Sequence, residues 1–489
     1  MHAPLQLGAC VALVVEGGPA RLLWAARPRE APTLPGFHVL PGGLLDPLDD
    51  ALPHDGGDHL HARVACLREL FEETGILLAH GAERLDPASL DVLRDALIEG
   101  DEDAAERFAA AGLTWRTAEL VPIGRWVTPD FAPERFDTRF FAVRLPAPIP
   151  PSLVLNELAH AEWIEVPEAL ARFARGGILA PPPLLALLRD LAKGALDEDA
   201  LRALYGASGE PAQRWEVVPG VWLLPFRTPT LPPATHTNSY LVGTGEALLV
   251  EPATPYADER ERMLRWLLEA KRGGIAPVAI FVTHHHVDHV GAARALVEQL
   301  GLPLWAHAET AARLDVPVAR LLAHGERITL AGPTPMTLCA VHTPGHAPGH
   351  LCLYEEASGA LIAGDMVASE GTILVEPQDG DMALYLASLA AMKALRPSVL
   401  LPAHGWPVRE ADALLDHYVA HRLAREAKIA AALGALGGPA SVHDLLPTAY
   451  DDAPLLVWPL AALSLEAHLI KLEREGRAVR SAAGWALAR

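Results

Sequence analysis

A short histidine-rich segment, Thr-His-His-His-Val-Asp-His at residues 283–289, constrains this chain of 489 residues more than any other feature. It follows the apolar run 277–282, which predicts a buried strand, and precedes residues 290–296, which predict the start of a helix. A strand end therefore presents four potential metal ligands: His284, His286, Asp288 and His289. Imidazole and carboxylate ligands are typical of zinc sites that keep a position open for water. The spacing lets the first two side chains face one ion and the next two face a second.

Three further potential ligands follow apolar segments downstream. They are His346 in Thr-Pro-Gly-His, Asp365 in Ala-Gly-Asp, and His404 in Pro-Ala-His-Gly. If those segments are strands, each places its ligand at a common edge of the sheets. Together with residues 283–289, this set resembles the metallo-β-lactamase-fold hydrolases, whose five ligand motifs are matched nearly in full.

The resemblance implies a centre of two zinc ions with a shared ligand. It implies His284, His286 and His346 on the first ion, Asp288, His289 and His404 on the second, and Asp365 between the two. Asp288 is also a candidate catalytic residue. His350 is expected to support a ligand rather than bind metal. Glu251 stands where the family usually has an aspartate that orients ligands, so we expect a shifted loop with the site preserved.

Two zinc ions would bring the pKa of a shared water towards neutrality and polarise the group that is attacked. The reaction class is therefore hydrolysis of an ester, a thioester or a phosphodiester, and the ligand set alone does not choose among them.

A second set of ligand-type residues lies in residues 68–76, Arg-Glu-Leu-Phe-Glu-Glu-Thr-Gly-Ile. Its Glu69, Glu72 and Glu73 are spaced i, i+3, i+4 and therefore share one face of a predicted helix. Three neighbouring carboxylates repel one another unless a cation neutralises them, and hard oxygen ligands suit Mg²⁺ or Mn²⁺. A solvated acidic helix face is the alternative interpretation.

This string resembles the core of the Nudix box, and Leu-Pro-Gly-Gly at residues 40–43 resembles the turn that precedes it. The likeness extends over most of residues 7–190 and, with its longer gap before the helix, is nearest to the coenzyme A diphosphatase branch. It implies that the three glutamates hold a catalytic metal and that Arg68 positions them through salt bridges. One departure is Leu60, which replaces the usual glutamate. A Nudix fold kept for binding, with weakened catalysis, is the alternative.

The C-terminal residues predict three helices and a short β-wing. We expect helices at residues 418–436 and 460–474, and between them one that begins at a capping Ser441. Leu463, Ala467, Ile470 and Leu472 are expected to face inward in the third helix. The pattern resembles the winged-helix module of one branch of the hydrolase fold. Residues 421–489 hold eight Lys or Arg against seven Asp or Glu, which favours packing or substrate capping over a groove-binding helix.

The sequence thus predicts a multidomain α/β protein. We expect an α/β/α Nudix domain at residues 1–193, a linker at 194–213, an αββα metallo-β-lactamase sandwich at 214–412 and a small winged helix at 413–489. The net charge of −21 disfavours a broad nucleic-acid surface. No apolar run is expected to reach the length of a membrane span. Four cysteines without a CxxC pair give neither a disulfide framework nor a thiolate site, so we expect the cytoplasm.

Two classes of function remain open. The first is a small-molecule hydrolase, in which the zinc domain cleaves a thioester or ester, as glyoxalase-II-like relatives do, and the Nudix domain cleaves a nucleotide diphosphate. A coenzyme A thioester contains both bonds. The second is a zinc-dependent endoribonuclease or phosphodiesterase with a nucleic-acid-binding winged helix. In a further alternative, the Nudix domain senses a ligand and regulates the hydrolase.

Overall fold

The computed structural model describes residues 4–128, 134–153, 157–194, 196, 201, 204 and 215–488. It divides into two compact units, one formed by residues 1–174 with 178–215 and the other by residues 175–177 with 216–489. The linker expected at residues 194–213 lies almost entirely outside the described residues. The two units are therefore described separately.

The first unit is built on a seven-stranded mixed sheet with the order β3-β2-β1-β8-β7, in which β4 also pairs with β1 and β9 with β2. The two longest strands, β1 and β8, run parallel over eleven residue pairs. The strands are β1 (Leu5–Val15), β2 (Arg21–Ala26), β3 (His38–Val39), β4 (Gly42–Leu44), β7 (Val121–Val127), β8 (Arg135–Leu145) and β9 (His160–Glu165). A small separate sheet pairs β5 (Ala79–His80) with β6 (Thr114–Trp115).

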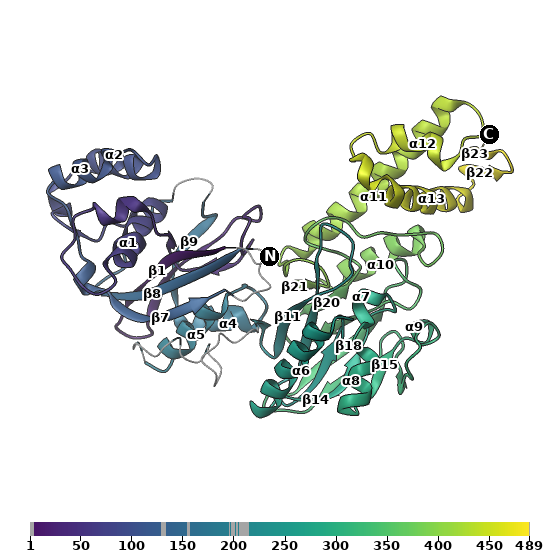
Figure 1. Cartoon of the computed structure of the whole chain (residues 1–489), viewed down its shortest axis with the longest axis horizontal. Coiled ribbons are helices and arrows are strands. Elements are labelled where there is room, and N and C mark those ends of the chain that lie inside the picture. Colours follow the sequence, from purple (N-terminus) through teal and green to yellow (C-terminus); the bar gives the residue numbers. More distant parts are fainter. Residues whose placement is uncertain are drawn as a thin grey trace. The chain divides into compact units, whose positions relative to one another are not determined.

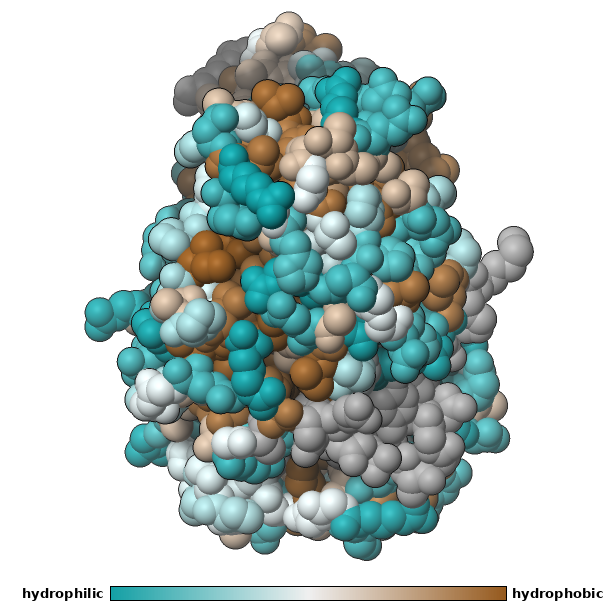
Figure 2. Space-filling model, turned by 90° about the vertical axis from the view of Figure 1, so that its left-hand side faces the viewer, coloured by the Kyte–Doolittle hydropathy of each residue, from teal (hydrophilic) through white to brown (hydrophobic). Residues whose placement is uncertain are grey.

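Helices lie on both sides of this sheet, as expected for an α/β/α unit (Figure 1). They are α1 (Leu60–Thr74), α2 (Pro87–Ile98), α3 (Ala104–Ala110), α4 (Val166–Ala174) and α5 (Pro182–Leu191). The apolar side chains of α1, including Leu67 and Leu70, pack with Val11 and Leu13 of β1 in one core. Because these apolar side chains face the core, the glutamates of α1 lie on its other face. On the face of the molecule shown in Figure 2, polar side chains surround smaller apolar areas.

The second unit contains two sheets that form the predicted sandwich. The first sheet runs β10 (Trp215–Val218), β11 (Val221–Arg227), β12 (His236–Val242), β13 (Glu246–Val250), β14 (Ala276–Phe281), β15 (Leu304–Ala306) and β16 (Arg320–Leu321). The second runs β17 (Arg327–Leu330), β18 (Met336–His342), β19 (Leu351–Glu355), β20 (Ala360–Gly364) and β21 (Val399–Pro402). In each sheet the strands pair in chain order.

Helices cover the outer faces of this sandwich (Figure 1). The first sheet is accompanied by α6 (Ala257–Arg272), α7 (Val287–Val290), α8 (Ala293–Leu300) and α9 (Ala308–Ala311). The second is covered by α10 (Met382–Ala394) and the start of α11 (Ala411–Leu436), whose Tyr385, Leu389 and Leu415 share a core with β18 to β21. Because β13 runs parallel to β14, and β20 to β21, the loops after these strands leave the same edge of their sheets.

The C-terminal part has the three helices and the wing that the sequence predicts. They are the second half of α11, α12 (Val442–Ala449), α13 (Trp458–Arg474) and the hairpin of β22 (Ala478–Ser481) and β23 (Gly484–Leu487). The Ser441 cap is confirmed, since its hydroxyl accepts from the Asp444 N–H and the Asp444 carboxylate accepts from the Ser441 N–H in return. Helix α11 runs without a break across the expected domain boundary at residues 412–413.

The expectation about α13 is confirmed for Ala467 and Leu472, which are buried, and wrong for Leu463 and Ile470. Leu463 and Ile470 are only half-buried, whereas Ala461, Leu465, Leu469 and Leu472 form the buried stripe with Ala467. Residues 455–474 also form a helix that has the length and mean hydropathy, 1.5, of a membrane span, which corrects the expectation that no run reaches that length. Its stripe packs in the core of the C-terminal part, and a buried core helix passes the same test.

Candidate metal centres

The seven predicted zinc ligands lie together at one edge of the sandwich. Each follows a strand, as the sequence predicts: residues 284–289 come after β14, His346 after β18, Asp365 after β20 and His404 after β21. β14, β18 and β20 are inner strands with a neighbour on each side, and the edge strand β21 is buried and pairs with β20, so the loops that carry the ligands start from fixed positions. Gly364 shows how tightly the loops approach, since a Cβ there would lie 2.4 Å from His350 Nε2.

Three histidines form the first group of potential ligands. His284 Nε2 lies 2.9 Å from His286 Nδ1, and His346 Nε2 lies 3.2 Å and 3.0 Å from these two atoms. Burial lowers the pKa of His284 well below its usual value and that of His346 to about 4. The rings of His284 and His346 are therefore neutral near pH 7. Three imidazole nitrogens that converge in this way suit a bound cation.

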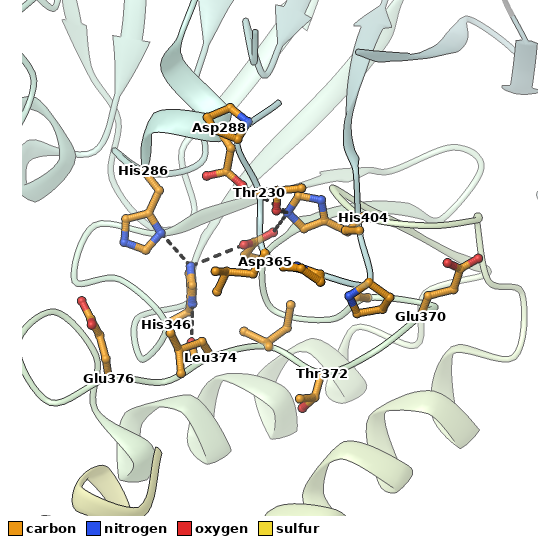
Figure 3. A pocket seen from close by; sticks show the side chains of 17 residues that line it. Thr230, His286, Asp288, His346, Asp365, Glu370, Thr372, Leu374, Glu376 and His404 are labelled. Atoms are coloured by element: carbon orange, nitrogen blue, oxygen red, sulfur yellow. Dashed lines mark hydrogen bonds and ion pairs between the residues drawn. The ribbon is translucent and has the colours of Figure 1, made fainter. Parts of the chain in front are cut away.

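Asp288, His289 and His404 form the second group. Asp365 stands between the two groups: its Oδ2 lies 3.5 Å from His346 Nε2, and its Oδ1 lies 3.3 Å from His404 Nε2 (Figure 3). Burial opposes protonation of His289, but the carboxylates of Asp365, Asp288 and Glu251 outweigh it and raise its pKa well above the usual value. This second group therefore attracts positive charge.

Two buried atoms of the centre lack a hydrogen-bond partner among the described residues, namely His289 Nε2 and Asp365 Oδ1. Unsatisfied buried polar atoms are costly, and a cation bound beside these two atoms would satisfy both. The seven side chains thus fit a pair of metal ions, with Asp365 positioned to touch both.

The ring nitrogen of each histidine that faces away from the centre has its own partner. His284 Nδ1 pairs with the Thr283 hydroxyl, His289 Nδ1 with Glu251, His346 Nδ1 with the Leu374 carbonyl and His404 Nδ1 with the His236 carbonyl, at 2.8 to 3.1 Å. Such partners fix the tautomer and leave the other nitrogen free for a metal. Glu251 therefore orients a ligand as expected. The supporting role of His350 is also confirmed, because its Nε2 accepts from the Asp365 N–H.

Sequence reasoning missed Asp379, which is the corresponding partner of His286. Its Oδ2 lies 3.0 Å from His286 Nε2 and 3.2 Å from His285 Nε2, and Arg313 lies 3.6 Å from its Oδ1. Asp379 belongs to the loop before α10 and follows no strand, so no periodic signal marks it. His236 is half-buried, and its backbone carbonyl lies 2.9 Å from His404 Nδ1.

The cavity over this centre has a volume of about 200 Å³. Its floor is formed by metal-ligand side chains, and its walls come from residues 229–234 and 368–376 (Figure 3). The cavity therefore leaves the ligand side chains His286, Asp288, His346, Asp365 and His404 accessible.

The glutamates of the first unit are arranged differently. Arg68 Nη1 lies 3.0 Å from both Glu69 Oε1 and Glu72 Oε2, and its Nε lies 2.7 Å from Asp49, so the predicted salt-bridging role of Arg68 is confirmed. The third, Glu73, accepts a hydrogen bond of 3.0 Å from the Gly42 N–H. Burial raises the pKa of Glu69 to about 7 and that of Glu73 well above its usual value.

The Gly-Gly segment before this helix, Gly42 and Gly43, stands where no side chain fits. A Cβ on Gly43 would lie 2.4 Å from the Glu69 carboxyl carbon, and one on Gly42 would lie 2.3 Å from the Ala9 carbonyl. Among the described residues, the groups of three His, Cys, Asp or Glu side chains that converge on one point all lie in the second unit. The structure thus places the three glutamates on one helix without drawing them together, and their Mg²⁺ or Mn²⁺ site stays a prediction.

Two stacked sheets with a ligand cluster at their edge are the arrangement of the metallo-β-lactamase fold. Residues 232–404 match the family model of the metallo-beta-lactamase superfamily, and residues 441–485 match that of the beta-lactamase associated winged helix domain. The chain therefore contains both domains, as the sequence predicts.

Among curated relatives, the "Beta-lactamase-like protein 2 homolog" of Drosophila melanogaster is 28% identical over 49% of this chain and 83% of its own length. "Thioesterase pkgB" of Emericella nidulans is 33% identical over 40% of this chain. The matched part of this chain spans 54%, about half, of the length of that relative. A crystal structure of a NUDIX hydrolase from Alicyclobacillus acidocaldarius is 30% identical over 40% of this chain and 98% of its own, with a TM-score of 0.35. That score is too low to establish a shared fold.

Proposed function

We propose that the second unit is a dinuclear zinc hydrolase that cleaves a thioester or a related ester. The observation that carries the proposal is the pair of ligand groups that share Asp365. Zinc ions held there would supply a hydroxide nucleophile at neutral pH and polarise the carbonyl of the substrate. The relative named as a thioesterase supports the choice of thioester.

The residues around the ligands prepare the site before a substrate arrives. The outer partners of the histidines hold the rings in one tautomer, and burial keeps His284 and His346 neutral. Asp365 contacts both groups, so it fixes their spacing. A rigid, preorganised arrangement of this kind does not need to reorganise in the transition state.

The C-terminal domain supports a small-molecule substrate rather than a nucleic acid. Each Lys and Arg among the described residues 421–488 has a partner within the protein: Arg422, Arg425, Lys428, Lys471, Arg474, Arg477 and Arg480. The buried Glu426 is the shared partner of three neighbouring side chains. They are His468 and Lys471 of α13 and Arg477, which lies just before the wing. Cations engaged in this way are poorly placed to neutralise phosphates.

We further propose that the first unit is a Nudix hydrolase domain acting on a nucleotide diphosphate with Mg²⁺ or Mn²⁺. The support is the helix α1 with its three glutamates and the glycine turn that fits against them. A coenzyme A thioester carries both bonds, so one class of metabolite would serve both units. The four cysteines are free in the structure, which suits a reducing compartment, and we place the protein in the cytoplasm.

An assay of the full chain with zinc and magnesium tests these assignments. Butyryl-coenzyme A and labelled single-stranded RNA serve as substrates, with His286→Ala, Glu72→Ala and, as a matched control, the exposed His443→Ala. We expect thiol release that is lost in His286→Ala alone and cleavage of the coenzyme A diphosphate that is lost in Glu72→Ala alone. RNA cleavage lost in His286→Ala, without thiol release, would overturn the thioesterase proposal. Diphosphate cleavage unchanged in Glu72→Ala would overturn the Nudix assignment.

A further inference from the structure

The mouth of the cavity over the metal centre carries two carboxylates that bind no metal. Glu370 and Glu376 line it on either side of the ligand cluster, with Thr372 between them (Figure 3). Glu370 is exposed and Glu376 half-buried. Neither carboxylate has a hydrogen-bond or ion-pair partner among the described residues, so no neighbouring side chain offsets either one.

The remaining walls of the cavity are apolar or neutral. Leu231, Pro232, Pro233, Ile373 and Leu374 are among its lining residues. No Lys or Arg is among the residues that line the cavity. No Lys or Arg side chain of the lining therefore offsets the two glutamates at the rim, and positive charge in the cavity would come from the metal ions at its floor.

Two cations near the walls of the cavity, Arg422 and Arg313, are engaged elsewhere. Arg422 is 3% exposed and donates to the Ile373 carbonyl and, at 3.1 Å, to Thr372 Oγ1, so it supports the wall from behind. Arg313 lies beside Asp379 and pairs with Glu309 at 2.9 Å. Neither guanidinium reaches the cavity to offset the two glutamates.

We propose that Glu370 and Glu376 make the pocket selective for substrates whose acyl group is neutral or cationic, and that they reject acyl groups that end in a carboxylate. This specificity rests on the proposed thioester hydrolysis and deepens it. The pantetheine arm of a coenzyme A thioester is uncharged next to the sulfur, so the rim admits it. Two like charges about 6 Å apart in a medium of dielectric about 40 repel by an amount that corresponds to about a tenfold loss in rate or affinity.

Three coenzyme A thioesters with the same two-carbon spacer test the proposal: β-alanyl, butyryl and succinyl, which end in an ammonium, a methyl and a carboxylate. We expect kcat/KM for the succinyl ester to be about tenfold or more below that for the butyryl ester, and the β-alanyl ester to be at least as good as butyryl. In Glu370→Gln/Glu376→Gln the succinyl and butyryl values should converge. Glu269→Gln, which removes an exposed negative charge on α6, should leave the ratio of the succinyl and butyryl values unchanged.

Binding of the three matching thioether analogues, which cannot be hydrolysed, separates this proposal from the proposed function. If no thioester is cleaved but the analogues bind in the same order of charge, the thioesterase proposal fails and the selectivity stands. If the butyryl and succinyl esters are cleaved equally well by the parent chain, the selectivity is wrong while the thioesterase proposal stands. An unchanged ratio in the double variant would also overturn the role of the two glutamates.

Discussion

The Asp379 carboxylate lies 3.0 Å from Nε2 of His286, whose other nitrogen, Nδ1, faces His284 and His346. Asp379 thus completes the set of outer partners for the five histidines of the centre. It also contacts His285, which turns away from the ligand cluster. A carboxylate behind a metal-binding imidazole fixes its tautomer and raises its basicity.

Replacement of Asp379 by alanine should weaken zinc binding at the first group by about tenfold to a hundredfold, because His286 loses its fixed orientation. Zinc affinity is measured by competition with a chromophoric chelator. Asp315→Ala, which removes an exposed carboxylate paired with Arg294, is the control and should bind zinc as the parent does. Equal zinc affinity in Asp379→Ala and the parent would show that Asp379 does not position His286.

Arg422→Met should lower kcat/KM for the thioester by about tenfold while the zinc content stays unchanged. The guanidinium is buried and holds the backbone of Ile373 and the side chain of Thr372, and methionine leaves those acceptors without a donor. Arg425→Met, one turn away, is the matched control, because Arg425 instead pairs with Asp452 at 2.7 Å. If both variants lose activity equally, Arg422 acts only through the stability of the C-terminal domain.

The stability of helix α1 should depend on the ionisation of Glu69. Its pKa of about 7 in the folded chain lies above the ordinary value of 4.5, so the folded state binds more protons between these values. Stability is therefore fully present below about pH 4.5 and falls as the pH rises through about 7, by up to about 3 kcal/mol at roughly 1.4 kcal/mol per pKa unit.

Hydrogen exchange of the α1 amides at pH 5 and pH 8 in the presence of a chelator, corrected for intrinsic exchange rates, measures this dependence. Glu69→Gln should reduce it and leave the share of Glu73, whose pKa is also raised, whereas the exposed Glu83→Gln should leave it unchanged. Excess Mg²⁺ should restore protection at pH 8 if the glutamates bind the ion. A parent and a Glu69→Gln variant with the same pH dependence would contradict the raised pKa of Glu69.

The sequence was most informative where a ligand follows a strand. His346, Asp365 and His404 each come directly after an apolar run, and the parallel pairing of β20 with β21 brings such ends to one edge. Asp379 lies in an irregular loop, so its contact with His286 depends on how that loop folds over the centre. The carbonyls of Leu374 and His236, which hold two other ligands, carry no side-chain signal at all.

Helical periodicity likewise predicted only part of the buried face of α13. The pattern predicts an inward stripe through Leu463 and Ile470, but Leu465 and Leu469 are the buried positions. An Ala- and Leu-rich helix offers several apolar faces of similar strength, and the packing against α11 and α12 selects one of them. The ion pairs of Arg68, by contrast, were predictable, because Glu72 lies one turn away on the same helix.

The zinc content of the second unit is a direct test of the proposed dinuclear centre. It is measured by elemental analysis of the reconstituted full chain in a Glu72→Ala background, so that the first unit contributes no ion. Two zinc ions per chain are expected, with His346→Ala and His404→Ala each reducing the content to one, because each removes a ligand from a different group. A single zinc ion in the Glu72→Ala chain, or two ions retained in His404→Ala, would contradict a dinuclear centre.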